Sequence, residues 1–194
     1  ARKEGGRHAS RKDSADREIK TGGPSKKEAM IRHRIYVRHS EVEAADKLSI
    51  HCIKRSVRAA LFLEGADIRC EVNVMVTCDR DMREINYSCR GVDMTTDVLS
   101  FPMHYLVPGN FEVAADAADR ETGLFLLGDI VLSAERVILQ AQEYGRTKKQ
   151  ETAYLTVHSV LHLLGYDHMD EAEDKRKMRG REKEIMRRLG MQEE

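Results

Sequence analysis

Three histidines near the carboxyl end of the chain have the spacing of a metal site. His158, His162 and His168 lie in the run HSVLHLLGYDH, with Gly165 between the second and the third. Side chains four residues apart project from one face of a helix, so His158 and His162 can bind the same ion if this segment is helical. A turn at Gly165 would bring His168 to the open side of the pair. Three imidazoles with one vacant position are the ligand set of a catalytic zinc ion, so we expect these histidines to bind zinc.

The residues before the histidines predict a helix that can carry them. Residues 150–157 contain no Gly or Pro. Apolar residues recur at helical spacing: Ala153, Val157, Leu161 and Leu164. We therefore expect an amphipathic helix that ends near Gly165, with its apolar stripe toward the core and its histidines on an adjoining face. Glu151 shares that face, but an acid in the first turn usually complements the helix dipole, and we expect that role for it.

The spacing H-x-x-x-H-x-x-G-x-x-H is also that of the metzincin proteases, which makes a zincin-type metallopeptidase the first alternative. Those enzymes carry Glu directly after the first His, where it acts as the general base for the zinc-bound water. Ser159 occupies this position here. A serine cannot replace that base, so the peptidase hypothesis is weakened.

Composition predicts one folded domain behind a polar tail. The 194 residues are 41% hydrophobic, which is enough for one substantial core. Residues 1–29 contain no Leu, Val, Phe, Tyr, Trp or Met and are rich in Arg, Lys, Gly and Ser. We expect them to form a disordered basic tail, with the domain over residues 30–194. The four cysteines form no C-x-x-C pair and are expected to be reduced packing residues.

Charge and hydropathy restrict the classes of function. Lys+Arg and Asp+Glu number 33 each, so any contact with RNA must be local. The chain has no run of 18 apolar residues and no apolar signal core at its start. Neither a membrane span nor secretion is expected, and we expect a cytoplasmic protein.

Periodicity predicts alternating strands and helices within the domain. We expect an edge-like strand over residues 31–37 and further strands over residues 70–78, 95–102 and 126–132. Expected helices cover residues 42–63, 80–87 and 170–189, and another begins after a Ser133 cap. Residues 88–93 and 104–125 are expected to be loops, the second long enough to be functional.

Two ordered segments resemble a known family. They are residues 86–102, NYSCRGVDMTTDVLSFP, and the histidine run; residues 127–133, LGDIVLS, add a third motif. From about Ile31 to Gly190 the chain closely resembles the bacterial YbeY family of single-strand-specific endoribonucleases and rRNA maturation factors. The resemblance implies an α+β fold of one domain, in which a mixed sheet of about four strands packs with about five helices, including a zincin-like metal helix.

The resemblance also implies a site and partners. It assigns one Zn²⁺ ion to the three histidines and makes Arg90 the functional arginine of the cleft. It implies single-stranded rRNA and the small ribosomal subunit as partners, with ribosome-associated proteins as further partners and no membrane. The implied roles are 16S rRNA 3′ end processing and ribosome quality control. One departure is Ser159, where the family usually has Gly. The helix should tolerate serine, although its side chain occupies space that glycine leaves open.

The chemistry of these residue types agrees with cleavage of a phosphodiester bond. A zinc ion held by three histidines lowers the pKa of bound water toward about 7 and polarises a substrate oxygen. A guanidinium binds phosphate in bidentate fashion and stabilises charge that develops at phosphorus. Without the resemblance, Arg90 would be interpreted as a solvated loop arginine.

Other polar residues allow a functional and a plain interpretation. Asp167 and Asp170 could orient a ligand imidazole or simply be solvated. Asp97 could hydrogen-bond within its turn, and Ser100 could present a hydroxyl beside the cleft. Basic clusters at residues 54–58 and 175–183 could steer RNA, but we prefer solvated helix faces. A last alternative is a non-enzymatic ribosome-assembly factor whose zinc is structural, which a closed site with four protein ligands would support.

Overall fold

The computed structural model describes residues 31–40, 42–43, 47–114, 116–167 and 172–192. The expected tail of residues 1–29 and the expected third ligand, His168, lie outside these ranges. The described elements are, in chain order, β1 (Arg34–His39), α1 (Ile50–Leu63), β2 (Cys70–Thr77), α2 (Asp79–Arg90), β3 (Val98–Pro102), β4 (Phe125–Ser133), α3 (Ala134–Glu143), α4 (Lys148–Leu163) and α5 (Ala172–Leu189).

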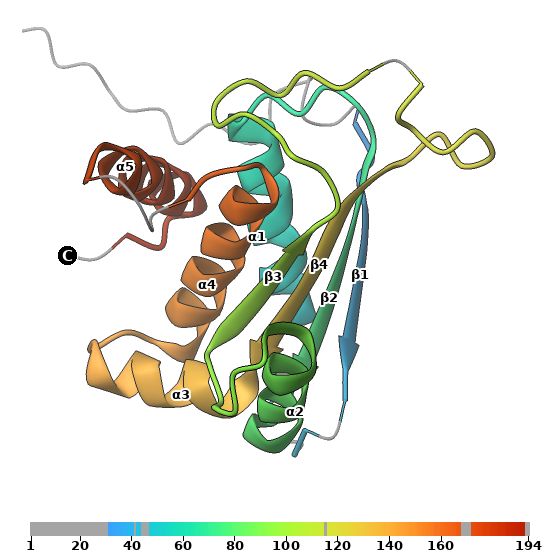
Figure 1. Ribbon diagram of the computed structural model, residues 1–194. Helices are drawn as coiled ribbons and strands as arrows, with labels where there is room; N and C mark the ends of the chain where they lie inside the picture. Colours follow the sequence, from blue (N-terminus) through green and yellow to red (C-terminus); the bar gives the residue numbers. More distant parts are fainter. Residues whose placement is uncertain (1–30, 41, 44–46, 115, 168–171, 193–194) are drawn as a thin grey trace, which may run out of the picture.

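The strands form one mixed sheet in the order β1-β2-β4-β3 (Figure 1). β1 and β4 both run parallel to β2, whereas β3 runs antiparallel to β4. Parallel neighbours need a crossover between them, and α1 makes the connection from β1 to β2. The expected α+β fold with a mixed four-stranded sheet is confirmed, and so is the edge position of the first strand.

The two faces of the sheet carry cores of different size. Ile130 and Leu132 of β4 point into the large core, to which α1, α4 and α5 also contribute. Val131, between them, points to the other face and packs with Leu99 and with Met82 of α2. This alternation is the period of two that the sequence of a strand dictates. The candidate site lies where α4 passes the short strand β3.

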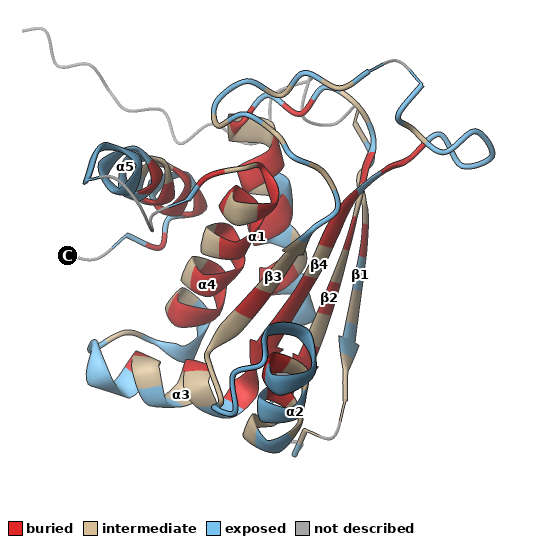
Figure 2. Cartoon of the chain, viewed as in Figure 1, coloured by how far each residue is buried: buried red, intermediate tan, exposed pale blue. Residues whose placement is uncertain are grey.

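Helix α4 is buried on several sides, so the expectation of an amphipathic helix was wrong (Figure 2). It contacts α1, α3 and α5 as well as β3 and β4. Two of its buried polar side chains are satisfied within the helix, because Thr152 and Thr156 each donate a 2.7 Å hydrogen bond to the carbonyl four residues earlier. Thr147 and Gln150 form a capping box at its first turn.

Four element boundaries differ from the expectation. β3 begins at Val98 rather than at residue 95. β1 covers Arg34–His39 rather than residues 31–37. α1 begins at Ile50, because the Ser49 side chain caps it by accepting from the Cys52 amide. α2 continues to Arg90, and its C-cap is Gly91 with φ of 71°. Arg90 is therefore the last residue of a helix and not a loop residue.

The remaining local expectations agree with the structure. β2 and β4 lie where the sequence predicted strands, and the Ser133 hydroxyl caps α3. Met178, Ile185 and Leu189 of α5 are buried, as their spacing predicted. All four cysteines are free thiols. None of the helices in the described ranges combines the length and the apolar composition needed to cross a lipid bilayer.

A sharp turn after α4 depends on Gly165. Its φ of 89° is a left-handed conformation that other residues rarely adopt. A Cβ atom at this position would lie 2.0 Å from the carbonyl oxygen of Leu106, in the loop that follows β3. Only glycine therefore allows the end of α4 and this loop to approach each other.

We expect Gly165→Ala to lower the free energy of unfolding by about 2–5 kcal/mol, since it combines left-handed strain with a backbone clash. Gly145→Ala is the matched control, because Gly145 has φ of 66° but a Cβ added there would meet no atom within 4 Å. That control should lose only about 1–2 kcal/mol. Urea denaturation of both variants measures the difference, and equal losses would show that the contact with Leu106 is unimportant.

Candidate functional site

His158 and His162 line a cleft of about 650 Å³. One wall is the end of α4 with the turn at Gly165, and another is β3 with the residues that lead into it. The end of α2 contributes Arg90, and the loop after β3 contributes residues 104–106. The structure thus brings two of the expected zinc ligands and the expected functional arginine, which are far apart in sequence, to one cavity.

The two histidines are arranged as a pair that suits one metal ion. Their Nε2 atoms are 3.1 Å apart, and their rings are nearly perpendicular, with centroids 4.6 Å apart. Two bonds of 2.0–2.1 Å to one tetrahedral ion would separate the nitrogen atoms by about 3.3 Å. The described residues contain no group of three or more His, Cys, Asp or Glu side chains that would hold a metal, and His168 lies outside them. The pair fits two ligands of the expected set.

Glu182 of α5 orients the first histidine. Its Oε1 atom lies 2.7 Å from Nδ1 of His158, and its side chain is only 6% exposed. A neutral imidazole that donates from Nδ1 keeps a lone pair on Nε2, which is the atom that faces His162. Tyr154 donates a 3.4 Å hydrogen bond to the other oxygen of Glu182. Burial and then the charge of Glu182 raise the pKa of Tyr154 to about 12, so the phenol stays a donor.

Sequence reasoning missed Glu182, although a signal was present. The residue lies four positions after Met178 and three before Ile185, so it interrupts the inward-facing apolar stripe of α5. An acid at such a position needs a buried partner. Its partner could not be identified because it is on another helix, 24 residues away.

Arg90 is an exposed residue held at the edge of the cleft. Its Nη2 atom donates a 3.3 Å hydrogen bond to the carbonyl of Ser100, and its guanidinium carbon lies 5.9 Å from the centroid of the Phe101 ring. Asn86 donates a 2.7 Å hydrogen bond to the Met94 carbonyl and so ties the segment after α2 back to the helix. The position at the end of α2 also places the cation where a helix dipole favours it.

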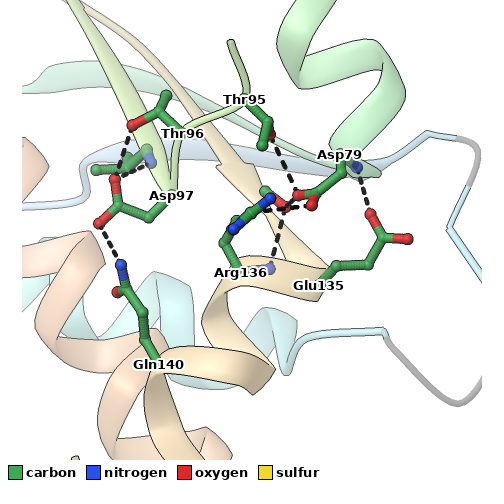
Figure 3. A network of polar contacts seen from close by, with 9 residues as sticks. Asp79, Thr95, Thr96, Asp97, Glu135, Arg136 and Gln140 are labelled. Atoms are coloured by element: carbon green, nitrogen blue, oxygen red, sulfur yellow. Dashed lines mark hydrogen bonds and ion pairs between the residues drawn. The ribbon is translucent and has the colours of Figure 1, made fainter. Parts of the chain in front are cut away.

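A polar network anchors the segment that leads into β3 (Figure 3). Asp97 accepts hydrogen bonds from the Val98 amide at 2.8 Å and the Thr96 hydroxyl at 3.0 Å, which is the turn role expected for it. Its other oxygen accepts from Gln140 of α3 at 3.0 Å. The side chain of Asp97 thus fixes a wall of the cleft against α3.

A second part of this network joins the starts of α2 and α3. Asp79 accepts hydrogen bonds from the Ser133 hydroxyl at 2.5 Å and from Arg136 at 2.9 Å. Thr95 donates to the same carboxylate at 3.3 Å, and the Asp79 amide donates to Glu135. Through Asp79, the loop that precedes β3 is therefore linked to the starts of both α2 and α3.

The turn after α4 is fixed by a chain of polar groups. Tyr166 donates a 2.6 Å hydrogen bond to Glu64, and Arg181 binds the other oxygen of that carboxylate at 2.6 Å. Burial and the neighbouring Glu64 carboxylate raise the pKa of Tyr166, so it remains a hydrogen-bond donor. These contacts join α1, α5 and the turn, and they set the direction in which the chain leaves Gly165.

Other expected residues have mixed outcomes. Asp167 and Ser100 line the cleft, whereas Asp170 lies outside the described residues. Glu151 is in the first turn of α4, but it is fully buried and forms a 2.7 Å ion pair with Arg146, away from the cleft. Ser159 is also fully buried, and its hydroxyl has no hydrogen-bond partner among the described residues. An unpaired buried hydroxyl costs about 1–3 kcal/mol, so serine is tolerated here rather than favoured.

Comparison with known proteins gives a consistent result. A family described as Endoribonuclease YbeY matches residues 34–190. A Clostridium botulinum (strain Eklund 17B) protein named Endoribonuclease YbeY is 44% identical over 163 residues, which cover 80% of this chain and 97% of that protein. One from Clostridium acetobutylicum is 48% identical over 142 residues, 69% of this chain and 84% of that protein. The solution structure of TM1509 from Thermotoga maritima, at 24% identity, covers 80% of this chain and 91% of that one with a TM-score of 0.48.

We expect Glu182→Gln to weaken binding of Zn²⁺ by about 10-fold or more, because an amide orients and polarises the His158 ring less well than a carboxylate. Competition with a chromophoric chelator measures the affinity directly, without reference to activity. Glu184→Gln is the matched control, since it removes the same charge two residues away, where Glu184 pairs with Arg181. Equal affinities for the two variants would rule out an orienting role for Glu182.

Proposed function

The chain belongs to the YbeY family of endoribonucleases, and we propose that it is a metal-dependent hydrolase that cleaves phosphodiester bonds within single-stranded RNA. The observation that carries this proposal is the cleft itself, in which a pair of imidazoles and a guanidinium face one cavity. Imidazoles suit a metal, and a guanidinium suits a phosphate. Together they match the needs of phosphodiester hydrolysis better than those of peptide hydrolysis.

We assign the metal ligands to His158 and His162, with His168 as the third. The 3.1 Å separation of the two Nε2 atoms supports one shared metal ion, and imidazole ligands with one open position favour zinc. When bound, the ion supplies a water of lowered pKa and an electrophile for a phosphoryl oxygen. Glu182 keeps the Nδ1 atom of His158 engaged, so that the ring presents Nε2 to the cleft.

Arg90 binds and orients the phosphate in this proposal. Its guanidinium donates to non-bridging oxygens and stabilises the negative charge that grows on them in the transition state. The hydrogen bond to the Ser100 carbonyl and the contact with Phe101 limit the positions the side chain can adopt. Such pre-organisation is what makes an electrostatic contribution effective.

The mouth of the cleft supports a single-stranded substrate. Tyr105 lines the cleft, and its side chain is fully exposed. A solvent-exposed aromatic ring stacks on an unpaired base, whereas the bases of a duplex are already stacked on each other. We further propose that the substrate is ribosomal RNA, including the 3′ end of 16S rRNA, and that the protein has a role in ribosome quality control. The family to which the chain belongs supports ribosomal RNA as the substrate.

The peptidase alternative receives no support from the site. Ser159, which stands where metzincins carry the general base, is fully buried and has no carboxylate. The assembly-factor alternative predicts that the same cleft binds metal without cleaving RNA. Measurement of cleavage therefore separates it from our proposal.

We expect Arg90→Ala to reduce the single-turnover rate of cleavage of a labelled single-stranded RNA by about 10²–10³-fold, the loss typical of one transition-state donor. His162→Ala should abolish cleavage. Arg58→Ala, which removes an exposed cation from α1, is the control and should cleave at the wild-type rate. Circular dichroism confirms that each variant is folded.

Arg90→Ala protein that cleaves as fast as the control would contradict the role of Arg90. A wild-type protein that binds zinc but never cleaves RNA would favour the assembly factor.

A further inference from the structure

A second hollow, of about 700 Å³, lies between α4 and α5. We call it the α4–α5 groove and define it by Arg146, Gln150, Tyr154, Arg179, Lys183 and Arg187. Glu182 also lines this groove, and the same carboxylate hydrogen-bonds His158, which lines the cleft. The groove and the cleft therefore meet at the Glu182–His158 contact.

One wall of the groove is a row of three cations on α5. Arg179, Lys183 and Arg187 follow each other at intervals of four residues, so they share one face of the helix over about 12 Å. All three are exposed, and in the described part of the chain none of them forms an ion pair. The row is a local excess of positive charge on a protein with no net charge.

The acids of α5 that could neutralise this row are directed elsewhere. Glu182 is buried against His158, and Glu184 pairs with Arg181, which also binds Glu64 of α1. Because the intervening acids have partners of their own, the three cations face the groove without a counter-charge on the same helix face. The sequence of this segment had favoured an ordinary solvated face, since acids and bases alternate along it.

The cation of the opposite wall already has a counter-charge. Arg146 pairs with the buried carboxylate of Glu151 at 2.7 Å, and its guanidinium lies 4.7 Å from the centroid of the Tyr154 ring. Met186 and Met191 are buried and form an apolar part of the lining. The groove therefore has one cationic side, along which a charged polymer can lie.

We propose that the α4–α5 groove binds the sugar–phosphate backbone of the RNA strand that flanks the scissile phosphate. This inference rests on the proposed endoribonuclease function. Three features point to a single strand of RNA as the occupant. The unpaired cations complement phosphates, the groove adjoins the cleft at the Glu182–His158 contact, and the space between two packed helices is too narrow for a duplex. Contacts here would let the protein hold a strand on both sides of the scissile bond.

The test measures the salt dependence of RNA binding by fluorescence anisotropy. The probe is a labelled single-stranded RNA of about 16 nucleotides, and the parent protein is the full chain with His162→Ala, so that the RNA stays intact. Each phosphate contact on a single strand contributes about −0.7 to the slope of log K against log salt. Adding Arg179→Gln and Lys183→Gln should reduce the magnitude of this slope by about 1.4.

Lys54→Gln with Arg58→Gln, in the same parent, is the matched control because it removes two cations from the face of α1. Its slope should equal that of the parent. The proposal is overturned if the α5 variant keeps the parent slope, if the control loses as much, or if only binding of the corresponding duplex is affected. Failure of the proposed function is a separate observation, namely that wild-type protein cleaves no RNA, and it does not depend on any of these slopes.

Discussion

The hydrogen bond between Glu182 and His158 is the interaction on which the arrangement of the site depends. A carboxylate that is only 6% exposed is costly unless it is paired, so this contact fixes α5 against α4 at one defined register. The same contact selects the nitrogen of His158 that faces His162. The cleft lies on one side of it and the α4–α5 groove on the other. One buried pair thus determines both the chemistry of the histidine and the shape of the surface around it.

The other parts of the site are held by contacts that are distant from the metal ligands. Gly165 allows the loop after β3 to approach the end of α4, and the Tyr166–Glu64 hydrogen bond fixes the direction of the chain beyond it. Asp97 holds the start of β3 against α3, and Arg90 extends from the end of α2. Each wall of the cleft is therefore held in place by a different set of contacts. A change in any of these supports would alter the geometry without removing a functional group.

Much of the fold could be predicted because its signals are local. The alternation of β2, the Ser133 cap and the four-residue spacing of His158 and His162 all depend on neighbours in sequence. Two of the boundaries that were wrong, those of α1 and α2, depended on a single competing residue. Leu48 continues the apolar spacing of α1 toward the amino end, but the Ser49 cap makes the helix begin at Ile50. Gly91 and not Tyr87 marks the end of α2. Local signals compete at such positions, and only the folded chain decides between them.

The tertiary features of the site could not be read from the sequence. Burial of α4 on several sides results from the helices and strands around it, which its own periodicity does not report. Glu182 and the cationic row of α5 looked like parts of one solvated helix. They differ only because Glu182 points to His158 while Arg179 and Lys183 point to the groove. The expected roles of Arg90 and the histidines came from motifs, and the structure supplies the shared cleft that makes those roles compatible.

The most direct test of a metal-driven RNA cleavage site is a titration of metal-free protein with Zn²⁺ while the initial rate of RNA cleavage is recorded. Our account predicts no cleavage without metal, a rate that rises in proportion to bound zinc and a plateau at one equivalent. Full cleavage by metal-free protein, or a rate that does not follow the bound metal, would contradict it.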